Sequence, residues 1–196
     1  MWSWSAKRTL SVAQELYDSH KLTTYPRTDS RFLPEDMMES ISKTIRQLGA
    51  QDDLNKHSQR LIDNGLKNVK RNFDNSKVSD HYAIIPTGKI PPSGLSSDAA
   101  KLYDLISRQF LSSFHPEAIW KVEKRIATKQ GQNFVKEARS LSTPGWRAVR
   151  PKKQNLPEGW GVLPSNPGPA TMSSHDFKEE KTKPPGRLKE AGLLRL

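Results

Sequence analysis

Cysteine is absent from this chain of 196 residues. That absence excludes a disulfide framework, a cysteine-ligated zinc site and a thiol nucleophile. Any metal site would have to be built from histidines and carboxylates instead. Apolar residues are also scarce, at 34% of the sequence against the ~45–50% of an ordinary soluble domain. The sequence therefore predicts a thin core for its length.

Long hydrophobic runs and acidic residues are the next shortages. No run approaches the ~18–20 apolar residues of a membrane span, and the first five residues lack the apolar stretch of a signal peptide. We therefore expect an intracellular protein without a membrane partner. The 21 Asp and Glu are outnumbered by 32 Lys and Arg, which gives a formal net charge of +11. Such an excess is typical of proteins that bind a polyanion.

Three stretches have the apolar spacing of amphipathic helices. The first spans residues 5–21, and the second spans 34–49 between a proline and a glycine. The third spans 97–114, with Ser97 and Asp98 as its expected caps. These patterns predict a mainly helical first half of the chain.

The apolar pattern changes after Pro116. Trp120, Val122 and Ile126 alternate with charged residues, which is the period of a β-strand. A turn over 130–132 and a second apolar run then predict a basic antiparallel hairpin. We therefore predict an α+β fold in three parts: a helical domain over 1–92, a helix with an antiparallel β segment over 93–165, and a basic, proline-rich linker leading into a further helix over 166–196.

The residues around Tyr25 form the most informative cluster. A tyrosine that attacks a phosphodiester must lose its phenol proton, because its ordinary pKa lies near ~10, and the phosphate oxygens must be held by a donor. Arg27 offers a planar guanidinium for that task, and an extended backbone would put positions 25 and 27 on one face. The alternative is structural: a tyrosine next to a proline often packs, and Arg27 and Asp29 would pair in water.

The segment from Leu22 to Pro34, LTTYPRTDSRFLP, resembles the active-site tyrosine segment of type IA DNA topoisomerases, and of their bacterial topoisomerase III branch in particular. Other segments resemble the same family in the same order: SAKRTL and AQELY before the tyrosine, DHYAIIPT at 80–87, PGW at 144–146 and KPPGRLKEA at 183–191. The resemblance therefore covers nearly the whole chain.

This resemblance implies a transesterification in which Tyr25 attacks a phosphodiester of single-stranded DNA and retains the 5′-phosphate as a covalent ester. The released 3′-hydroxyl reverses the attack after strand passage, so the chemistry needs no ATP. Arg27 would contact the scissile phosphate, and His81 would donate a hydrogen bond nearby, with a purely structural histidine as the alternative. The resemblance also implies further DNA-binding positions: Thr24, Asp29, Ser30, Arg31, Lys183, Arg187 and Lys189. Of these, Thr24, Asp29 and Ser30 would orient the segment and would not react themselves.

The family also carries a Toprim domain whose acidic cluster binds magnesium. This sequence contains no Asp-x-Asp pair with glutamate partners, so we expect no metal site in this chain. We therefore expect a fragment whose Mg²⁺ ligands and C-terminal segments belong to the rest of a longer enzyme. Such a fragment would bind single-stranded DNA weakly and would not relax supercoils by itself. The resemblance further implies a bacterial cytoplasmic location near the nucleoid.

The residues alone are also compatible with other functions. His57 and Arg60 fit the His-x-x-Arg element of tyrosine recombinases, with Tyr103 as candidate nucleophile, although chance explains the match in an arginine-rich chain. A rolling-circle relaxase would need a His-x-His pair, which the sequence lacks. A non-catalytic basic module could instead bind single strands by stacking bases on Trp146 or Trp160. A covalent adduct with DNA separates these functions.

Overall fold

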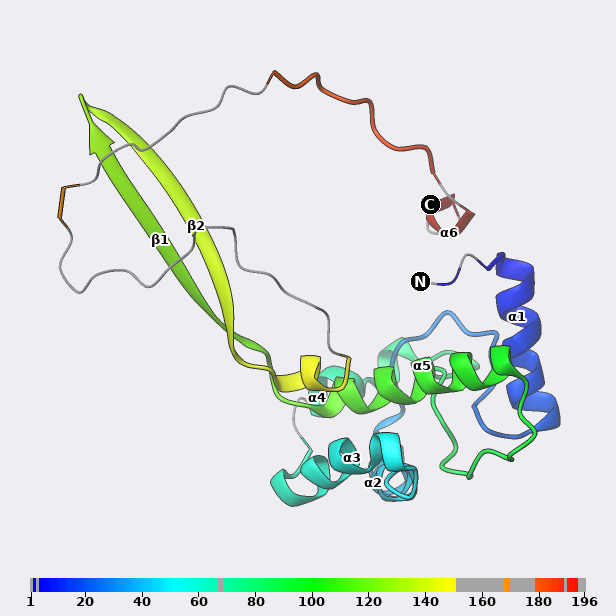
Figure 1. Ribbon diagram of the computed structural model, residues 1–196. Coiled ribbons are helices and arrows are strands. Elements are labelled where there is room, and N and C mark those ends of the chain that lie inside the picture. Colours follow the sequence, from blue (N-terminus) through cyan, green and yellow to red (C-terminus); the bar gives the residue numbers. More distant parts are fainter. Residues whose placement is uncertain are drawn as a thin grey trace. The chain divides into compact units, whose positions relative to one another are not determined.

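The computed structural model describes residues 2, 4–66, 69–150, 168–169, 179–188 and 190–193. The chain divides into two compact units, and the tyrosine segment lies in the first (Figure 1). The fold combines helices with an antiparallel strand pair, which confirms the predicted α+β class. The first unit comprises Met1–Ile119 and Thr143–Lys152, and the second comprises Trp120–Ser142 and Lys153–Leu196.

The first unit is helical. Its first helix, α1, continues directly into a π-helical turn over Glu15–Ser19, so the helix predicted over 5–21 is confirmed. A 3-10 turn over Glu35–Met37 leads into α2, as the proline at position 34 predicted. The α-helices of this unit are α1 (Ala6–Gln14), α2 (Met38–Leu48), α3 (Asp52–Asn64), α4 (Val69–Asn72) and α5 (Ser97–Phe114).

Helix α5 begins one residue earlier than the expected caps implied. The Ser96 hydroxyl accepts a hydrogen bond from the backbone N–H of Ala99 at 3.2 Å, so Ser96 is the N-cap and the assignment to Ser97 and Asp98 was wrong. The physical reason is the backbone: Ser96 has the extended conformation that an N-cap requires, with ψ 149°. Asp98 instead accepts from the guanidinium Nε of Arg8 on α1 at 3.0 Å.

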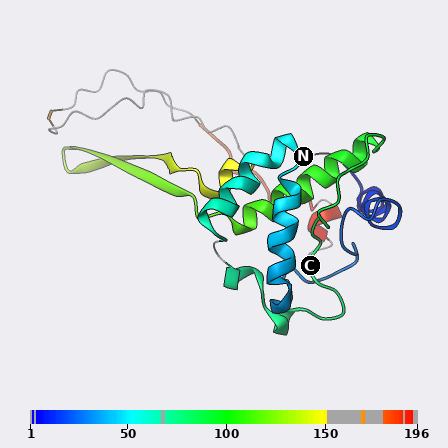
Figure 2. The same cartoon turned by 90° about the horizontal axis from the view of Figure 1, so that it is seen from below.

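The core of the first unit joins α1 and α3 to α5. Figures 1 and 2 show α1 next to the start of α5, and α2 packs on α3. Because α5 shares this core, the first unit extends beyond the boundary expected at residue 92; the prolines and glycine there mark only a loop. The fully buried core side chains include Leu16, Leu48, Leu111, Phe114 and Val149.

The second unit contains the antiparallel hairpin that the sequence predicted. Strand β1 spans Ile119–Lys129 and β2 spans Gln132–Thr143, paired antiparallel. The turn residues Gln130 and Gly131 have φ 51° and 78°, which matches a two-residue type I′ turn. A short helix, α6, spans Glu190–Leu193. None of the helices described is long and apolar enough to cross a membrane.

The chain returns to the first unit through a glycine that no other residue could replace without rearrangement. Gly145 has φ +48°, and a Cβ added there would lie 2.2 Å from the carbonyl oxygen of Glu117. Its backbone therefore approaches residues 116–117 more closely than a side chain allows. This approach, together with the hydrogen bond from the Trp146 N–H to Pro116 O at 2.9 Å, holds residues 145–146 against the residues that follow α5.

Candidate active site

The tyrosine segment is held by a second segment that lies far away in the sequence. Thr23 forms an isolated antiparallel bridge with Pro86, and the backbone N–H of Thr24 donates to Ile85 O at 2.9 Å. The Thr24 hydroxyl adds two more contacts: it donates to Ala83 O at 3.0 Å and accepts from the Ile85 N–H at 2.9 Å. The two segments that carry the family resemblance are therefore paired in space.

This pairing places His81 against Tyr25. Their ring centroids lie 4.5 Å apart at an interplanar angle of 42°. On another side, Tyr17 meets Tyr25 edge to face, with centroids 5.4 Å apart. The Thr28 hydroxyl donates to the His81 carbonyl at 3.0 Å, so the tyrosine segment itself holds the histidine backbone in place. Tyr25 is half-buried, whereas His81 is exposed to solvent.

A cavity of about 760 Å³ opens at Tyr25. Two lysines, Lys21 and Lys89, line it together with Tyr17, Tyr25 and His81, and its described lining includes no carboxylate. We call it the Tyr25 cavity. The Nζ of Lys21 lies 5.3 Å from the centroid of the Tyr17 ring, in cation–π geometry. A basic cavity that exposes a tyrosine suits an anionic substrate such as a phosphodiester.

The backbone that carries Lys21 is unusual. Lys21 adopts φ 56°, a left-handed conformation that costs a non-glycine residue about 1 kcal/mol or more. The Thr87 hydroxyl donates to the Lys21 carbonyl at 2.8 Å and holds this conformation. The sequence reasoning missed both lysines, although a signal existed: Lys21 directly precedes one family-like segment, and Lys89 follows the other by two residues.

Arg27 does not join Tyr25 in its cavity, contrary to what the alternation of side chains along an extended strand had predicted. The backbone bends at Thr24 and at Pro26, so the segment is not the regular strand in which positions 25 and 27 would share a face. Arg27 is exposed and does not line the Tyr25 cavity. It makes no ion pair with Asp29, whose carboxylate instead accepts from the Ser79 hydroxyl at 3.3 Å.

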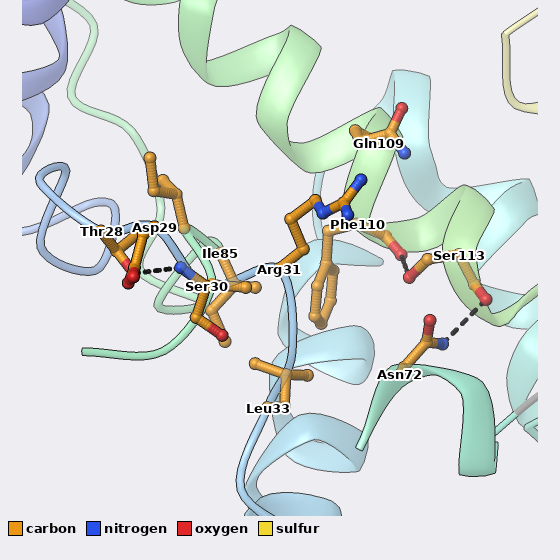
Figure 3. A pocket seen from close by; sticks show the side chains of 12 residues that line it. Thr28, Asp29, Ser30, Arg31, Leu33, Asn72, Ile85, Gln109, Phe110 and Ser113 are labelled. Atoms are coloured by element: carbon orange, nitrogen blue, oxygen red, sulfur yellow. Dashed lines mark hydrogen bonds between the residues drawn. The ribbon is translucent and has the colours of Figure 1, made fainter. Parts of the chain in front are cut away.

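The next residues of the segment line a second cavity of about 440 Å³, which Figure 3 shows from close by. Asp29, Ser30 and Arg31 form one wall of it, and Phe110 on α5 forms part of another. The Ser30 hydroxyl donates to Lys77 O at 2.7 Å, and Lys77 itself does not line the cavity. We call this the Arg31 cavity. Asp29, Ser30 and Arg31 are thus brought together, next to the Tyr25 cavity rather than inside it.

The remaining candidate residues divide into three groups. Lys183 and Arg187 are exposed in the second unit, and Lys189 lies outside the described residues, as does Trp160. Trp146 is 40% exposed, and the Arg147 guanidinium lies 5.6 Å from its ring centroid.

No group of three His, Asp or Glu in the part of the chain that the structure describes is placed to hold a metal ion, so these residues do not fit a magnesium site.

The structure gives no geometric support to the recombinase alternative. His57 is 5% exposed and Tyr103 is 3% exposed, so neither side chain can reach a DNA strand. Burial raises the pKa of Tyr103, which opposes formation of a phenolate. The Tyr103 hydroxyl is also used internally, because it donates to the Lys89 carbonyl at 3.3 Å.

Comparison with known proteins gives a consistent result. A family described as DNA topoisomerase matches residues 1–196. The chain is 37% identical to DNA topoisomerase 3 of Bacillus licheniformis and 36% identical to that of Bacillus subtilis, in each case over 98% of this chain and 27% of the relative. It is 30% identical to DNA topoisomerase 3 of Vibrio cholerae, over 98% of this chain and 30% of the relative. The chain thus spans less than a third of the length of these relatives.

Proposed function

The chain belongs to the DNA topoisomerase family, of the bacterial type IA, topoisomerase III-like kind, and from this premise we propose that Tyr25 is the nucleophile that cleaves and rejoins single-stranded DNA. The observation that carries the proposal is the Tyr25 cavity: a half-buried tyrosine lines it together with His81 and two lysines, and the described lining includes no carboxylate. A polyanion can enter such a cavity without meeting a like charge.

The proposed reaction exchanges one phosphodiester for another. The Tyr25 hydroxyl loses its proton as its oxygen bonds to phosphorus, and the bond from phosphorus to the 3′ oxygen breaks. The leaving oxygen takes up a proton and becomes a free 3′-hydroxyl, while the 5′-phosphate stays on Tyr25. Attack by that 3′-hydroxyl restores the strand. Because each step forms one phosphoester bond as it breaks another, the chemistry consumes no ATP.

The residues around Tyr25 have separate proposed tasks. His81 donates a hydrogen bond to a non-bridging phosphate oxygen, and Lys21 and Lys89 neutralise the charge that gathers on the phosphate during attack. Arg27, which is exposed two residues after Tyr25, contacts the scissile phosphate when DNA is bound. Thr24 fixes the segment through its two hydroxyl contacts. Because the described residues do not fit a magnesium site, no step is assigned to a metal ion.

Covalent trapping tests the proposal. The chain is incubated with magnesium and a single-stranded oligonucleotide, with and without a separately expressed Toprim domain, and then denatured. A label at the 3′ end of the DNA should remain on the protein, and a label at the 5′ end should not. This pattern separates a 5′-phosphotyrosine from the 3′-linkage of tyrosine recombinases. We further expect no relaxation of supercoiled DNA by the chain alone.

Two variants sharpen the experiment. Tyr25→Phe should form no adduct, whereas Tyr82→Phe, which removes another phenol from the lining of the same cavity, should still form it. An adduct that survives Tyr25→Phe would assign the nucleophile elsewhere. No adduct under any combination of domains would leave a non-catalytic module that binds single-stranded DNA through its basic residues.

A further inference from the structure

The Arg31 cavity and the Tyr25 cavity are lined by different residues of the same two segments. Both are formed where the tyrosine segment runs along the segment 81–87: Thr23, Thr24 and Tyr25 line the first, and Thr28 to Arg31 line the second. Ala83, Ile84 and Ile85 continue the wall that His81 and Tyr82 begin. A strand held at Tyr25 therefore has a second cavity next to it.

The Arg31 cavity has an apolar floor and a charged rim. Leu33, Ile85 and Phe110 are 3%, 7% and 4% exposed, so they form the buried floor. Figure 3 shows the Arg31 side chain directed away from Thr28 and Asp29, toward Gln109 and beside Phe110. Within the described residues the Arg31 guanidinium has no hydrogen bond or ion pair, while Gln109 already accepts a hydrogen bond from Arg150. The guanidinium is thus free to bind an anion.

We propose that the Arg31 cavity takes one nucleotide unit of the DNA strand that reaches Tyr25, with its phosphate on Arg31 and its base over the apolar floor. The identity of the ligand as DNA rests on the proposed function, but the site does not depend on chemistry at Tyr25. The volume, about 440 Å³, lies within the ~300–1,000 Å³ range of small-molecule sites. A mononucleotide unit therefore has room.

The rim argues for a nucleotide over a simple anion. The Asp29 carboxylate lines the same cavity as Arg31, so the lining offers a hydrogen-bond acceptor as well as a cation. A base edge offers N–H donors that a carboxylate can accept. Asn72 donates its amide N–H to Ser113 O at 2.9 Å, which leaves its amide oxygen as a further acceptor. An inorganic phosphate would also leave the apolar floor uncovered.

Salt-dependent binding to a labelled single-stranded oligonucleotide tests the phosphate contact. Arg31→Gln removes the charge and keeps most of the length, and Arg46→Gln removes an equal charge from an exposed position on α2. We expect Arg31→Gln to weaken binding about tenfold. It should also make the plot of the logarithm of the association constant against the logarithm of the salt concentration less steep by ~0.7, the value for one phosphate contact on a single strand. Equal effects of the two variants would overturn the proposal.

Filling the cavity tests the base contact without changing the charge. Ser113→Leu adds a bulky side chain to the lining at a helical position, and its circular dichroism spectrum verifies folding. It should weaken DNA binding and abolish the amide chemical-shift changes that thymidine 5′-monophosphate causes at Ser30 and Ile85. Thymidine and inorganic phosphate, added separately, should each bind more weakly than the nucleotide. Shifts caused by phosphate alone, to the same extent as by the nucleotide, would refute a nucleotide site.

The two proposals fail in different ways. If Arg31→Gln and Ser113→Leu bind DNA as the unaltered chain does while the Tyr25 adduct still forms, only the nucleotide cavity is refuted. If the adduct is absent but the Arg31-dependent salt slope and shifts are present, the cavity stands and the nucleophile does not. The Arg31→Gln result decides the question even if Ser113→Leu does not fold.

Discussion

At the scale of single residues, three small hydroxyls hold the site together. Thr24, Thr28 and Ser30 each bond to a backbone group of the segment 77–87, at distances of 2.7 to 3.0 Å. The two segments share only one bridge pair, Thr23 with Pro86, so the side chains replace much of a sheet's hydrogen-bond ladder. This arrangement lets the backbone bend at Thr24 and Pro26 and present Tyr25 in its cavity.

Thr24 gives the clearest test of this arrangement. Thr24→Val keeps the shape of the side chain but leaves Ala83 O without its hydroxyl donor and the Ile85 N–H without its acceptor. We expect a loss of ~1–3 kcal/mol in the free energy of unfolding, measured by urea denaturation, because both groups are only partly accessible to water. Thr24→Ser keeps the hydroxyl and should lose much less. Equal losses in the two variants would attribute the effect to packing instead of hydrogen bonding.

The sequence could predict part of this site and not the rest. It identified Tyr25 and His81, and the structure brings those two rings together. It placed Arg27 on the same face as Tyr25 because strand alternation assumes a regular backbone, which the bends at Thr24 and Pro26 remove. Lys21 and Lys89 were missed because their approach depends on a left-handed residue and a loop, and neither leaves a periodic signal.

At the scale of elements, two buried histidines join α3 to the end of α5. His57 on α3 and His115 just after α5 are 5% and 1% exposed, and their ring centroids lie 6.2 Å apart. Burial, the largest cause, lowers the pKa of His115, and with the smaller effects of His57 and Arg60 the pKa falls to about 4. Burial also lowers the pKa of His57, with smaller contributions from Lys56, Arg108 and Arg60. Both imidazoles are therefore neutral in the folded protein at pH 7.

This pair predicts a loss of stability in acid. In the unfolded chain a histidine binds its proton near pH ~6.5, whereas folded His115 binds it only near pH 4. Between these values the unfolded state holds more protons, so stability is complete above pH ~6.5 and falls as the pH drops toward 4. The lowered pKa of His115 corresponds to at most about 3 kcal/mol of this loss. Urea denaturation at several pH values measures it.

A matched pair of variants isolates the contribution of the histidines. His115→Gln should flatten the dependence of the unfolding free energy on pH, even if it lowers stability at pH 7. His57→Gln removes the other imidazole of the pair, whose pKa burial also lowers, and should flatten the dependence as well. An unchanged pH dependence in His115→Gln would contradict the assignment.

The elements themselves were largely predictable. Helical spacing identified α1, α2 and α5, and the turn at Gln130 and Gly131 identified the hairpin. The cap of α5 was one residue off because Ser96 and Ser97 are chemically identical, and only the backbone conformation distinguishes them. The contact of α5 with α1 and α3 could not be read from the chain, since loop composition near residue 92 is the same whether or not the next helix packs back.

At the scale of the whole molecule, the formal charge of +11 is the property that the sequence alone established. The structure shows where some of these positive charges lie: Lys21 and Lys89 line the Tyr25 cavity, and Arg31 lines the Arg31 cavity. The hairpin of the second unit has a different character, since Val122, Ile126, Phe134 and Val135 are each more than half exposed. Its surface is therefore apolar as well as basic.

Because the bound polyanion is held by separate cations, DNA affinity should depend steeply on salt. If Lys21, Lys89, Arg31 and Arg27 each contact one phosphate of a single strand, log K should fall against log salt with a slope of about −3. Fluorescence anisotropy of a labelled oligonucleotide across a range of salt concentrations measures that slope. Poly-aspartate, which carries the charge but no bases, should compete weakly, because it cannot stack on aromatic side chains. Affinity that does not change with salt would show that contacts other than these cations hold the strand.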